Sequence, residues 1–342
     1  MKKVILTIDV EGHKGKDPIE KLIWGKINGK MYGIPYIMDI CDRYEIEGIF
    51  FVDFAEAWDY GKEKIRDVVK YIVQRGHKVG VHLHPDHMKD KKRLFLWEYT
   101  YNEQYEMIKK CSDLYAEILG ERPKIFRAGK YGANIETLDI LNELGYIADF
   151  SQFYGQKWCG IYPTVAYNVI QKYKNILEIP VTTYESFSIG RFKRYDKIDA
   201  TMDFMTYKYV MKTIAKSHKD IVVSLFYHSF SMLDWRKRPN DPLFLESEKE
   251  KLEATIEYIK NDLDFTFVKL DNLLEEYITK NIEVESKETV LKISNNKILS
   301  IVFLFKLIWK IRRENKKIKK YLTYLKVFMV VIIVIIFFIK KM

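Results

Sequence analysis

The chain has 342 residues, of which 48% are hydrophobic and 15% aromatic, and its formal net charge is +10. This composition allows a large buried core and excludes a disordered or collagen-like chain. Its three cysteines are widely spaced, which excludes a disulfide framework and a cysteine-based zinc site. Residues 297–342 alone carry a net charge of +11, so the preceding 296 residues are nearly neutral. We therefore expect no nucleic-acid partner for the body of the protein.

The first 280 residues alternate between strand and helix patterns. The chain begins with a strand pattern and shows no long apolar stretch of the kind that a secretory signal needs. In chain order we expect a strand over 4–10, a helix over 36–44, a strand over 48–54, a helix over 64–75, a strand over 77–84, a helix over 98–119, strands over 124–127 and 146–150 with a helix over 135–144 between them, a strand over 176–181, a helix over 203–217, a strand over 221–228, a helix over 246–262, a strand over 265–270 and a helix over 272–280.

This alternation predicts an α/β domain over residues 1–282 with a parallel sheet, most simply a barrel of about seven strands. Two less regular stretches, Gln152 to Asn175 and Glu185 to Ala200, are expected to be long loops, and long loops in compact domains are often functional.

The C-terminal region has a different composition. Residues 283–296 are polar and predict a linker, and residues 297–342 combine basic runs with an apolar segment at 327–339. We expect a membrane-anchoring helical tail, since the apolar segment nearly reaches the length that spans a bilayer. In-plane attachment and a buried β-strand are the alternatives. The basic run before the apolar segment favours a cell-membrane protein whose body is cytoplasmic.

Chemically active side chains occur where the predicted strands end. Because the carboxyl ends of parallel strands meet at one edge of a barrel, these side chains are expected to lie together. Carboxylates, imidazoles and a guanidinium form a set that suits metal-assisted hydrolysis. The residues concerned are Asp9, Glu11, His82, His84, Arg127, Asp149 and His228.

Five motifs give the body a resemblance to the polysaccharide deacetylases with the NodB homology domain, which are carbohydrate esterases of family 4. They are Thr-Ile-Asp-Val-Glu at 7–11, Gly-His-Lys-Val-Gly-Val-His at 76–82, Phe-Arg-Ala-Gly-Lys-Tyr-Gly at 126–132, Gly-Tyr-Ile-Ala-Asp-Phe-Ser at 145–151 and Leu-Phe-Tyr-His at 225–228. The resemblance implies a distorted (β/α) barrel. The Asp-Val-Glu and His-Leu-His-Pro sequences indicate a divergent branch.

The resemblance also implies a divalent metal ion, with Zn²⁺ the expected one, held by Glu11, His82 and His84. The family's usual second histidine falls at position 86, where this sequence has Asp86. His84 is favoured as its replacement because it shares a strand face with His82. Ligation by Asp9, by Asp86 or by His87 stays open.

By the same resemblance, Asp9 is the general base, and Arg127 orients it and keeps it ionised. His228, steered by Asp149, protonates the departing amine. The implied reaction removes an N-acetyl group from a sugar or glycan, and the tail favours a lipid-linked intermediate of surface-polysaccharide assembly as the substrate.

Two other functions are compatible with the sequence. One is a metal-independent glycosidase on the same barrel, which would use Asp9 and Glu11 as its two carboxylates. The other is a membrane-tethered glycan-binding protein without activity, which the altered second motif suggests. Aromatic residues outside the motifs suit a sugar ligand in any of these cases, namely Trp158, Tyr162, Tyr167 and Trp235.

Overall fold

The computed structural model describes residues 2–12, 16–88, 90–161, 168–189, 192–217, 220–280, 282 and 291–292. Of the predicted linker and tail, only β14 (Leu291–Lys292) is among them, and the rest of both segments lies outside the described residues. No helix of the described part is long and apolar enough to cross a membrane. The chain divides into two units, Met1–Tyr184 with Tyr195–Leu291 and Glu185–Arg194 with Lys292–Met342.

A nine-stranded, mostly parallel sheet forms the centre of the first unit. Its order is β12-β1-β4-β5-β6-β7-β9-β8, and β13 also pairs with β1. Only β8 runs antiparallel to its neighbour. The strands are β1 (Lys2–Val10), β4 (Gly48–Asp53), β5 (Lys78–Leu83), β6 (Ile125–Ala128), β7 (Ala148–Asp149), β8 (Gln171–Tyr173), β9 (Ile176–Glu178), β12 (Val222–His228) and β13 (Phe265–Phe267).

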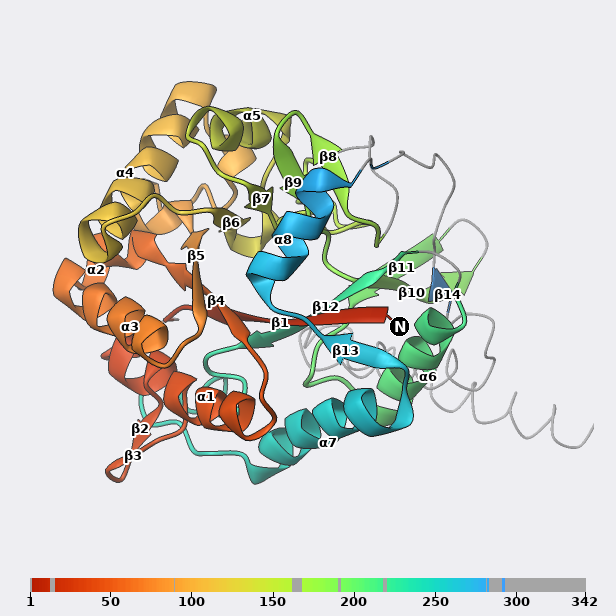
Figure 1. The fold of residues 1–342 in the computed structure, drawn as a ribbon. Coiled ribbons are helices and arrows are strands. Elements are labelled where there is room, and N and C mark those ends of the chain that lie inside the picture. The colour runs from red at the N-terminus through yellow and green to blue at the C-terminus, as the bar shows by residue number, and fades with distance from the viewer. Residues whose placement is uncertain are drawn as a thin grey trace, which may run out of the picture. The chain divides into compact units, whose positions relative to one another are not determined.

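Helices lie around the outside of these strands (Figure 1). They are α1 (Ile34–Arg43), α2 (Ala57–Tyr60), α3 (Lys62–Gln74), α4 (Tyr101–Leu119), α5 (Ile135–Glu143), α6 (Phe204–Ala215), α7 (Glu246–Asp262) and α8 (Leu270–Thr279). Short helical turns follow several strands: η1 (Ile19–Ile23), η2 (Phe54–Glu56), η3 (Pro85–His87), η4 (Leu96–Glu98) and η5 (Gly129–Tyr131). A two-stranded ribbon joins β2 (Lys26–Ile27) to β3 (Lys30–Met31).

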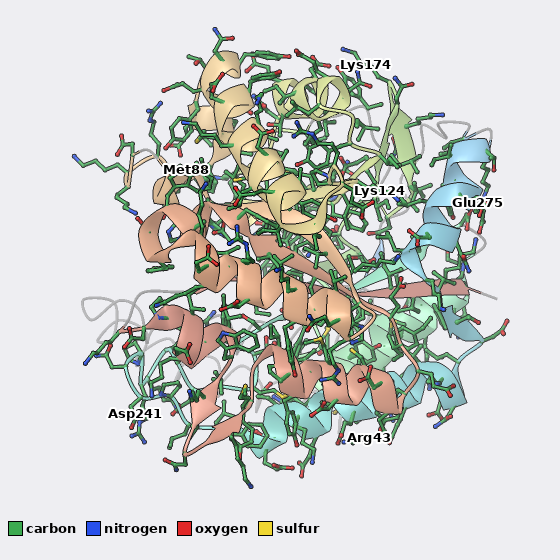
Figure 2. The ribbon with its side chains drawn as sticks, turned by 60° about the vertical axis from the view of Figure 1, so that its left-hand side comes forward. Arg43, Met88, Lys124, Lys174, Asp241 and Glu275 are labelled. Carbon is green, nitrogen blue, oxygen red and sulfur yellow. The ribbon has the colours of Figure 1, made fainter. Side chains whose placement is uncertain are left out.

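The helices are amphipathic, as their sequence spacing predicts. In α3, Ile65, Val68, Val69 and Ile72 are fully buried and recur at the three- and four-residue spacing of one helix face. Charged side chains occupy the outside of the molecule, and Figure 2 shows Arg43, Lys174, Asp241 and Glu275 at the periphery. The core therefore lies between the sheet and the inward faces of the helices.

The barrel is distorted because β12 and β8 are not joined by a ladder. Val169, before β8, bridges Ile221, before β12, and Asp199, after β11, bridges Phe226 of β12. Thr182 adds a side-chain link, because its Oγ1 accepts a hydrogen bond from Ser224 N at 2.8 Å. Isolated main-chain and hydroxyl contacts thus close the barrel on this side.

One predicted loop is wrong. The stretch from Glu185 to Ala200 is mostly strand, in β10 (Thr183–Ile189) and β11 (Phe192–Lys197), which belong to a second sheet ordered β11-β10-β14. Within the second unit, the Ser186 hydroxyl donates to the carbonyl of Arg194 at 3.3 Å.

Candidate metal centre and active site

The carboxyl ends of five parallel strands bring the predicted site residues to one edge of the sheet. Asp9 of β1 lies beside His228 of β12, and His82 of β5 lies beside Arg127 of β6. Side chains alternate along a strand, so Glu11 shares the face of Asp9, and His84 shares the face of His82.

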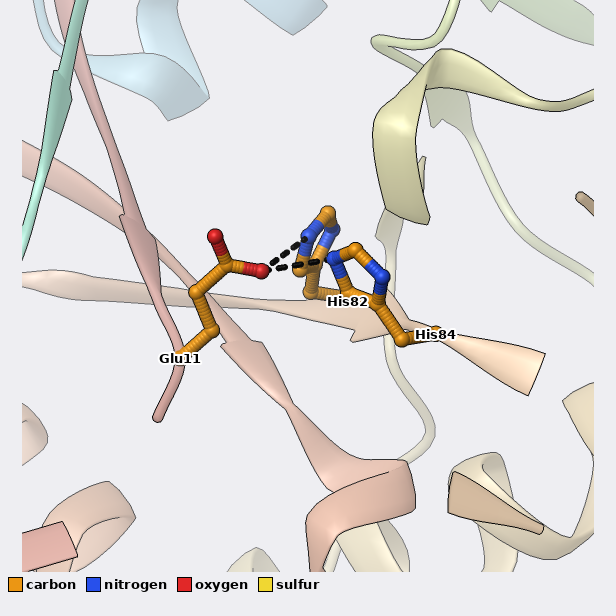
Figure 3. Close-up of side chains that lie close together, drawn as sticks. All are labelled: Glu11, His82 and His84. Atoms are coloured by element: carbon orange, nitrogen blue, oxygen red, sulfur yellow. Dashed lines mark ion pairs between the residues drawn. The ribbon is translucent and has the colours of Figure 1, made fainter. Parts of the chain in front are cut away.

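Glu11, His82 and His84 form a compact group of potential metal ligands. Their donor atoms all lie within 4.8 Å of one another. The Oε2 atom of Glu11 is 2.6 Å from His84 Nε2 and 3.7 Å from His82 Nε2, and Figure 3 shows both imidazoles facing this oxygen. All three side chains are buried, with at most 7% of their surface exposed.

Main-chain contacts hold the two imidazoles in place. The Nδ1 atom of His82 is 2.8 Å from the carbonyl oxygen of Arg127 and donates to it, which turns Nε2 toward Glu11. The ring of His84 packs on Gly129, where an added Cβ would come within 2.6 Å of the ring. Glycine is therefore required at position 129 for His84 to reach the site.

The electrostatics of this group favour a cation. Burial raises the pKa of the Glu11 carboxyl, but the neighbouring His84 and His82 outweigh it and hold that pKa well below its usual range. Burial lowers the pKa of His84, yet the Glu11 carboxylate raises it to about 9. Glu11 is thus an anion that stabilises a positive charge in the site. Without a metal ion, protonated His84 provides that charge.

The donor set fits a divalent metal ion. Two imidazole nitrogens and a carboxylate oxygen are common zinc ligands. Ligands around a tetrahedral ion lie about 3.4 Å apart, a separation set by metal–ligand bonds of about 2.1 Å. The contacts of 2.6 and 3.7 Å on Glu11 Oε2 lie on either side of this value. Glu11, His82 and His84 would therefore hold the ion.

Asp9 forms a buried ion pair with Arg127. The Arg127 Nη1 atom donates to Asp9 Oδ1 at 2.6 Å, and both side chains are almost completely buried. Burial raises the pKa of Asp9, but Arg127, His82 and His228 outweigh it and keep that pKa below its usual value. The second oxygen, Oδ2, is 3.9 Å from His82 Nε2 and so faces the metal-binding group. Asp9 is thus an ionised base beside the candidate metal.

His228 lies on the opposite side of Glu11. Its Nε2 atom is 3.6 Å from Glu11 Oε1, and its ring lies against Phe226 and Phe230. Burial lowers the pKa of His228 to about 4, with Glu11 acting against this shift. With 27% of its side chain exposed, His228 is the most accessible polar group of the site.

Asp149 does not contact His228, contrary to the predicted role. Asp149 lies beside Phe126 in β6, one residue before the inward-facing Arg127, so its side chain is on the opposite face of the sheet. Its carboxylate accepts hydrogen bonds from Ser151 N and Ser151 Oγ. Burial raises its pKa and that of the adjacent Glu178, which fits two carboxyl groups that share a proton. Asp149 therefore organises the β7 turn.

The structure also separates the alternative metal ligands. Asp86 faces the far nitrogen of His84, with its Oδ1 atom 3.9 Å from Nδ1, and it is not part of the Glu11 group. His87 lies with Asp53 and Glu56 in a different group.

Sequence reasoning missed Lys197, at the end of β11. Its Nζ atom donates to Tyr131 Oη at 2.9 Å and lies over the ring of Phe226. Burial lowers the pKa of Lys197 to about 8, against the charges of Asp199 and Asp9. No regular alternation in residues 192–197 signalled a strand, and the stretch was read as a loop. Lys130 and Tyr131 have left-handed backbone angles, with φ of 52° and 59°, which is strained for residues other than glycine and positions the Tyr131 ring.

Comparison with known proteins finds a family model that matches part of the chain. The polysaccharide deacetylase family model matches residues 28–148. Residues 28–148 are therefore similar to this family, and the match covers less than half of the chain. A comparison with curated proteins finds no match.

Solved structures resemble this chain at low sequence identity, and the first of the following three shares its fold. A Mycobacterium smegmatis protein described as a polysaccharide deacetylase has a TM-score of 0.52 at 15% identity, covering 83% of this chain and 93% of its own. The peptidoglycan deacetylase PdaC from Bacillus subtilis has a TM-score of 0.40 at 14% identity, covering 80% of this chain and 90% of its own. A CE4 family pseudoenzyme from Bacillus anthracis has a TM-score of 0.42 at 15% identity, covering 80% of this chain and 66% of its own.

Proposed function

We propose that this protein is a metal-dependent hydrolase that removes N-acetyl groups from a sugar or glycan. The observation that carries the proposal is the buried Asp9–Arg127 ion pair facing the Glu11, His82 and His84 group, with His228 on the other side. A divalent ion in that group, Zn²⁺ being the expected one, would lower the pKa of water to about 7 and polarise the amide carbonyl.

The residues of the chain divide the proton transfers between them. Asp9 accepts the proton of the attacking water, because Arg127 keeps its carboxyl ionised at neutral pH. His228 faces the reacting carbonyl from the opposite side and delivers a proton to the departing nitrogen. Its low pKa makes it neutral at rest, so it takes that proton from solvent, to which 27% of its side chain is exposed, as negative charge develops on the carbonyl oxygen, and Asp9 returns its own proton to solvent. The amide C–N bond breaks, and the products are acetate and a free sugar amine.

The site does not favour a glycosidase. Such an enzyme needs one protonated carboxylic acid beside its second carboxylate. The pKa of Asp9 and the pKa of Glu11 are both held below their usual values, so neither is a proton donor at neutral pH. The donor groups of Glu11, His82 and His84 are all in place, which also argues against a purely sugar-binding role.

The aromatic side chains beside His228 suit a carbohydrate substrate. Phe230 stacks on the His228 ring, and Trp235 lies edge-on to Phe230 with centroids 5.0 Å apart. Aromatic faces of this kind pack against sugar rings. The basic, apolar tail adds the finer proposal that the protein is attached to the cell membrane, its body on the cytoplasmic side, and that the substrate is a lipid-linked sugar.

The test is acetate release from N-acetylated sugars by the purified full chain. Asp9→Asn and His228→Ala should each lower the rate at least a hundredfold, the scale of lost general acid–base catalysis, and a chelator should abolish it. Asp241→Asn is the matched control, because Asp241 is 70% exposed and remote from these residues in the sequence. The proposal would be overturned if both active-site variants released acetate as fast as Asp241→Asn, or if the wild type kept its full activity in the presence of a chelator.

A further inference from the structure

A second group of potential metal ligands lies next to the first. It consists of Asp53 at the end of β4, Glu56 in η2 and His87 in η3, and the donor atoms of these side chains lie within 4.8 Å of one another. Asp53 and Glu56 have no exposed surface, and the side chain of His87 is 15% exposed. The proposed reaction uses none of the three residues.

Each carboxylate uses one oxygen to bind the main chain and leaves the other without a partner. Asp53 Oδ1 accepts hydrogen bonds from Ala55 N at 3.0 Å and from His84 N at 3.3 Å. Glu56 Oε1 accepts one from Gly12 N at 2.5 Å. The remaining atoms, Asp53 Oδ2 and Glu56 Oε2, are buried and have no hydrogen-bond partner. Buried carboxylate oxygens without a partner are costly, and a bound cation is one way to satisfy them.

His87 presents a free nitrogen to these carboxylates. Its Nδ1 atom is 2.7 Å from Asp59 Oδ2, so Nδ1 donates the hydrogen bond and Nε2 is turned toward Asp53 and Glu56. A carboxylate that orients a histidine in this way is common behind metal ligands. The Nε2 atom lies 3.8 Å from Asp53 Oδ2 and 3.9 Å from Glu56 Oε1. These separations are too long for hydrogen bonds and slightly exceed the separation of about 3.4 Å between ligands of one ion.

We propose that Asp53, Glu56 and His87 bind a second divalent cation beside the first. Two carboxylates and a neutral imidazole would balance its charge, and two oxygens with one nitrogen suit Zn²⁺, Co²⁺ or Mn²⁺.

The second site would tie together the loops that carry the first. Gly12, the residue after Glu11, donates to Glu56, and the amide of His84 donates to Asp53. A cation on Asp53 and Glu56 therefore fixes the backbone on which Glu11 and His84 stand. The second ion has a positioning role. Its binding does not depend on the proposed deacetylation.

The test is the metal content of the tag-free full chain. The protein is stripped with chelator, dialysed against Co²⁺ and analysed for bound cobalt. We expect two ions per chain in the wild type, one in His87→Ala and one in His84→Ala, which removes a ligand of the first site. Glu56→Gln, which keeps the side-chain shape, should also hold one. Asp86→Asn is the matched control and should keep two, because Asp86 belongs to neither group.

The outcomes separate this inference from the proposed function. One ion in the wild type that disappears in His84→Ala would overturn the second site, as would two ions retained in both His87→Ala and Glu56→Gln. One ion in the wild type that persists in His84→Ala and disappears in His87→Ala would support the second site and contradict the first. Circular dichroism verifies that each variant is folded.

Discussion

Arg127 is the residue on which the active site most depends, because it balances the charge of Asp9 inside the protein. Its guanidinium also donates to the Phe150 carbonyl and lies 4.2 Å from the centroid of the Phe51 ring. Breaking a buried ion pair costs more than removing both partners, because one uncompensated charge remains.

Arg127→Met should therefore lower the free energy of unfolding by about 3–5 kcal/mol. It should also abolish acetate release, since burial then raises the pKa of Asp9 against His82 and His228 only, without the guanidinium. The double variant Arg127→Met/Asp9→Asn should recover most of the stability and none of the activity. Urea denaturation followed by tryptophan fluorescence measures the free energy of unfolding of both variants. A double variant no more stable than Arg127→Met would contradict this account of the pair.

Lys197 should make the free energy of unfolding depend on pH in the alkaline range. Its pKa falls from 10.5 in the unfolded chain to about 8 in the fold. Between these values the unfolded chain binds more protons, so this contribution to stability is complete above pH 10.5 and is lost as the pH falls toward 8.

Lys197→Met should remove that dependence and be more stable than the wild type at pH 7. One pKa unit corresponds to about 1.4 kcal/mol, and the partial exposure of Lys197 reduces the effect. Unfolding free energies at pH 7, 8 and 9.5 measure it, with the exposed Lys172 changed to Met as the control. A constant difference between Lys197→Met and the wild type across this range would show that Lys197 does not titrate there.

The distorted side of the barrel depends on Thr182. Its hydroxyl accepts from Ser224 N and donates to Val222 O at 3.4 Å, so it stands in for a strand pair. Thr182→Val keeps the shape but leaves the buried Ser224 amide without its acceptor. We expect a loss of about 1–3 kcal/mol in the free energy of unfolding. Thr279→Val, which loses an exposed hydroxyl at the end of α8, should change it by less than about 0.5 kcal/mol. Equal losses in both variants would mean that Thr182 does not close the barrel.

The elements that the sequence predicted well are those whose pattern depends on local burial. The expected bounds of α7 match the structure, and β1, β4, β5 and β12 lie within or close to the expected ranges, because their apolar runs are long. Residues 192–197 were misread because this stretch, which pairs with the preceding strand β10, lacks a regular apolar alternation. The position of Lys197 depended on that pairing, so sequence alone could not bring it to the site.

Strand parity explains which site residues were placed well. Asp9 with Glu11 and His82 with His84 are two residues apart, so a local rule puts each pair on one face. The predicted role of Asp149 failed because the register between β6 and β7 decides which face it occupies. Phe126 lies beside Asp149, and no local sequence pattern reveals this pairing. The second cluster was missed for a similar reason, since Asp53, Glu56 and His87 come from two separate strand ends.

At the scale of the whole molecule, charge divides the chain into two parts. The first 296 residues are nearly neutral, and the last 46 carry +11 next to the apolar run at 327–339. Each basic residue near an anionic leaflet adds about 1 kcal/mol of attraction, and the apolar run adds the hydrophobic part. The tail is therefore proposed to decide where the protein lies, and the body to decide what it does.

Deleting residues 297–342 should move the protein from the membrane fraction to the supernatant without changing acetate release per molecule. Replacing the six basic residues between 312 and 320 by glutamine should instead weaken binding to anionic vesicles by about 1 kcal/mol for each charge removed, and leave binding to neutral vesicles unchanged. Carbonate washing distinguishes the two modes of attachment, because only a spanning tail resists it. A deletion variant that still sediments with membranes would place the anchor in the body.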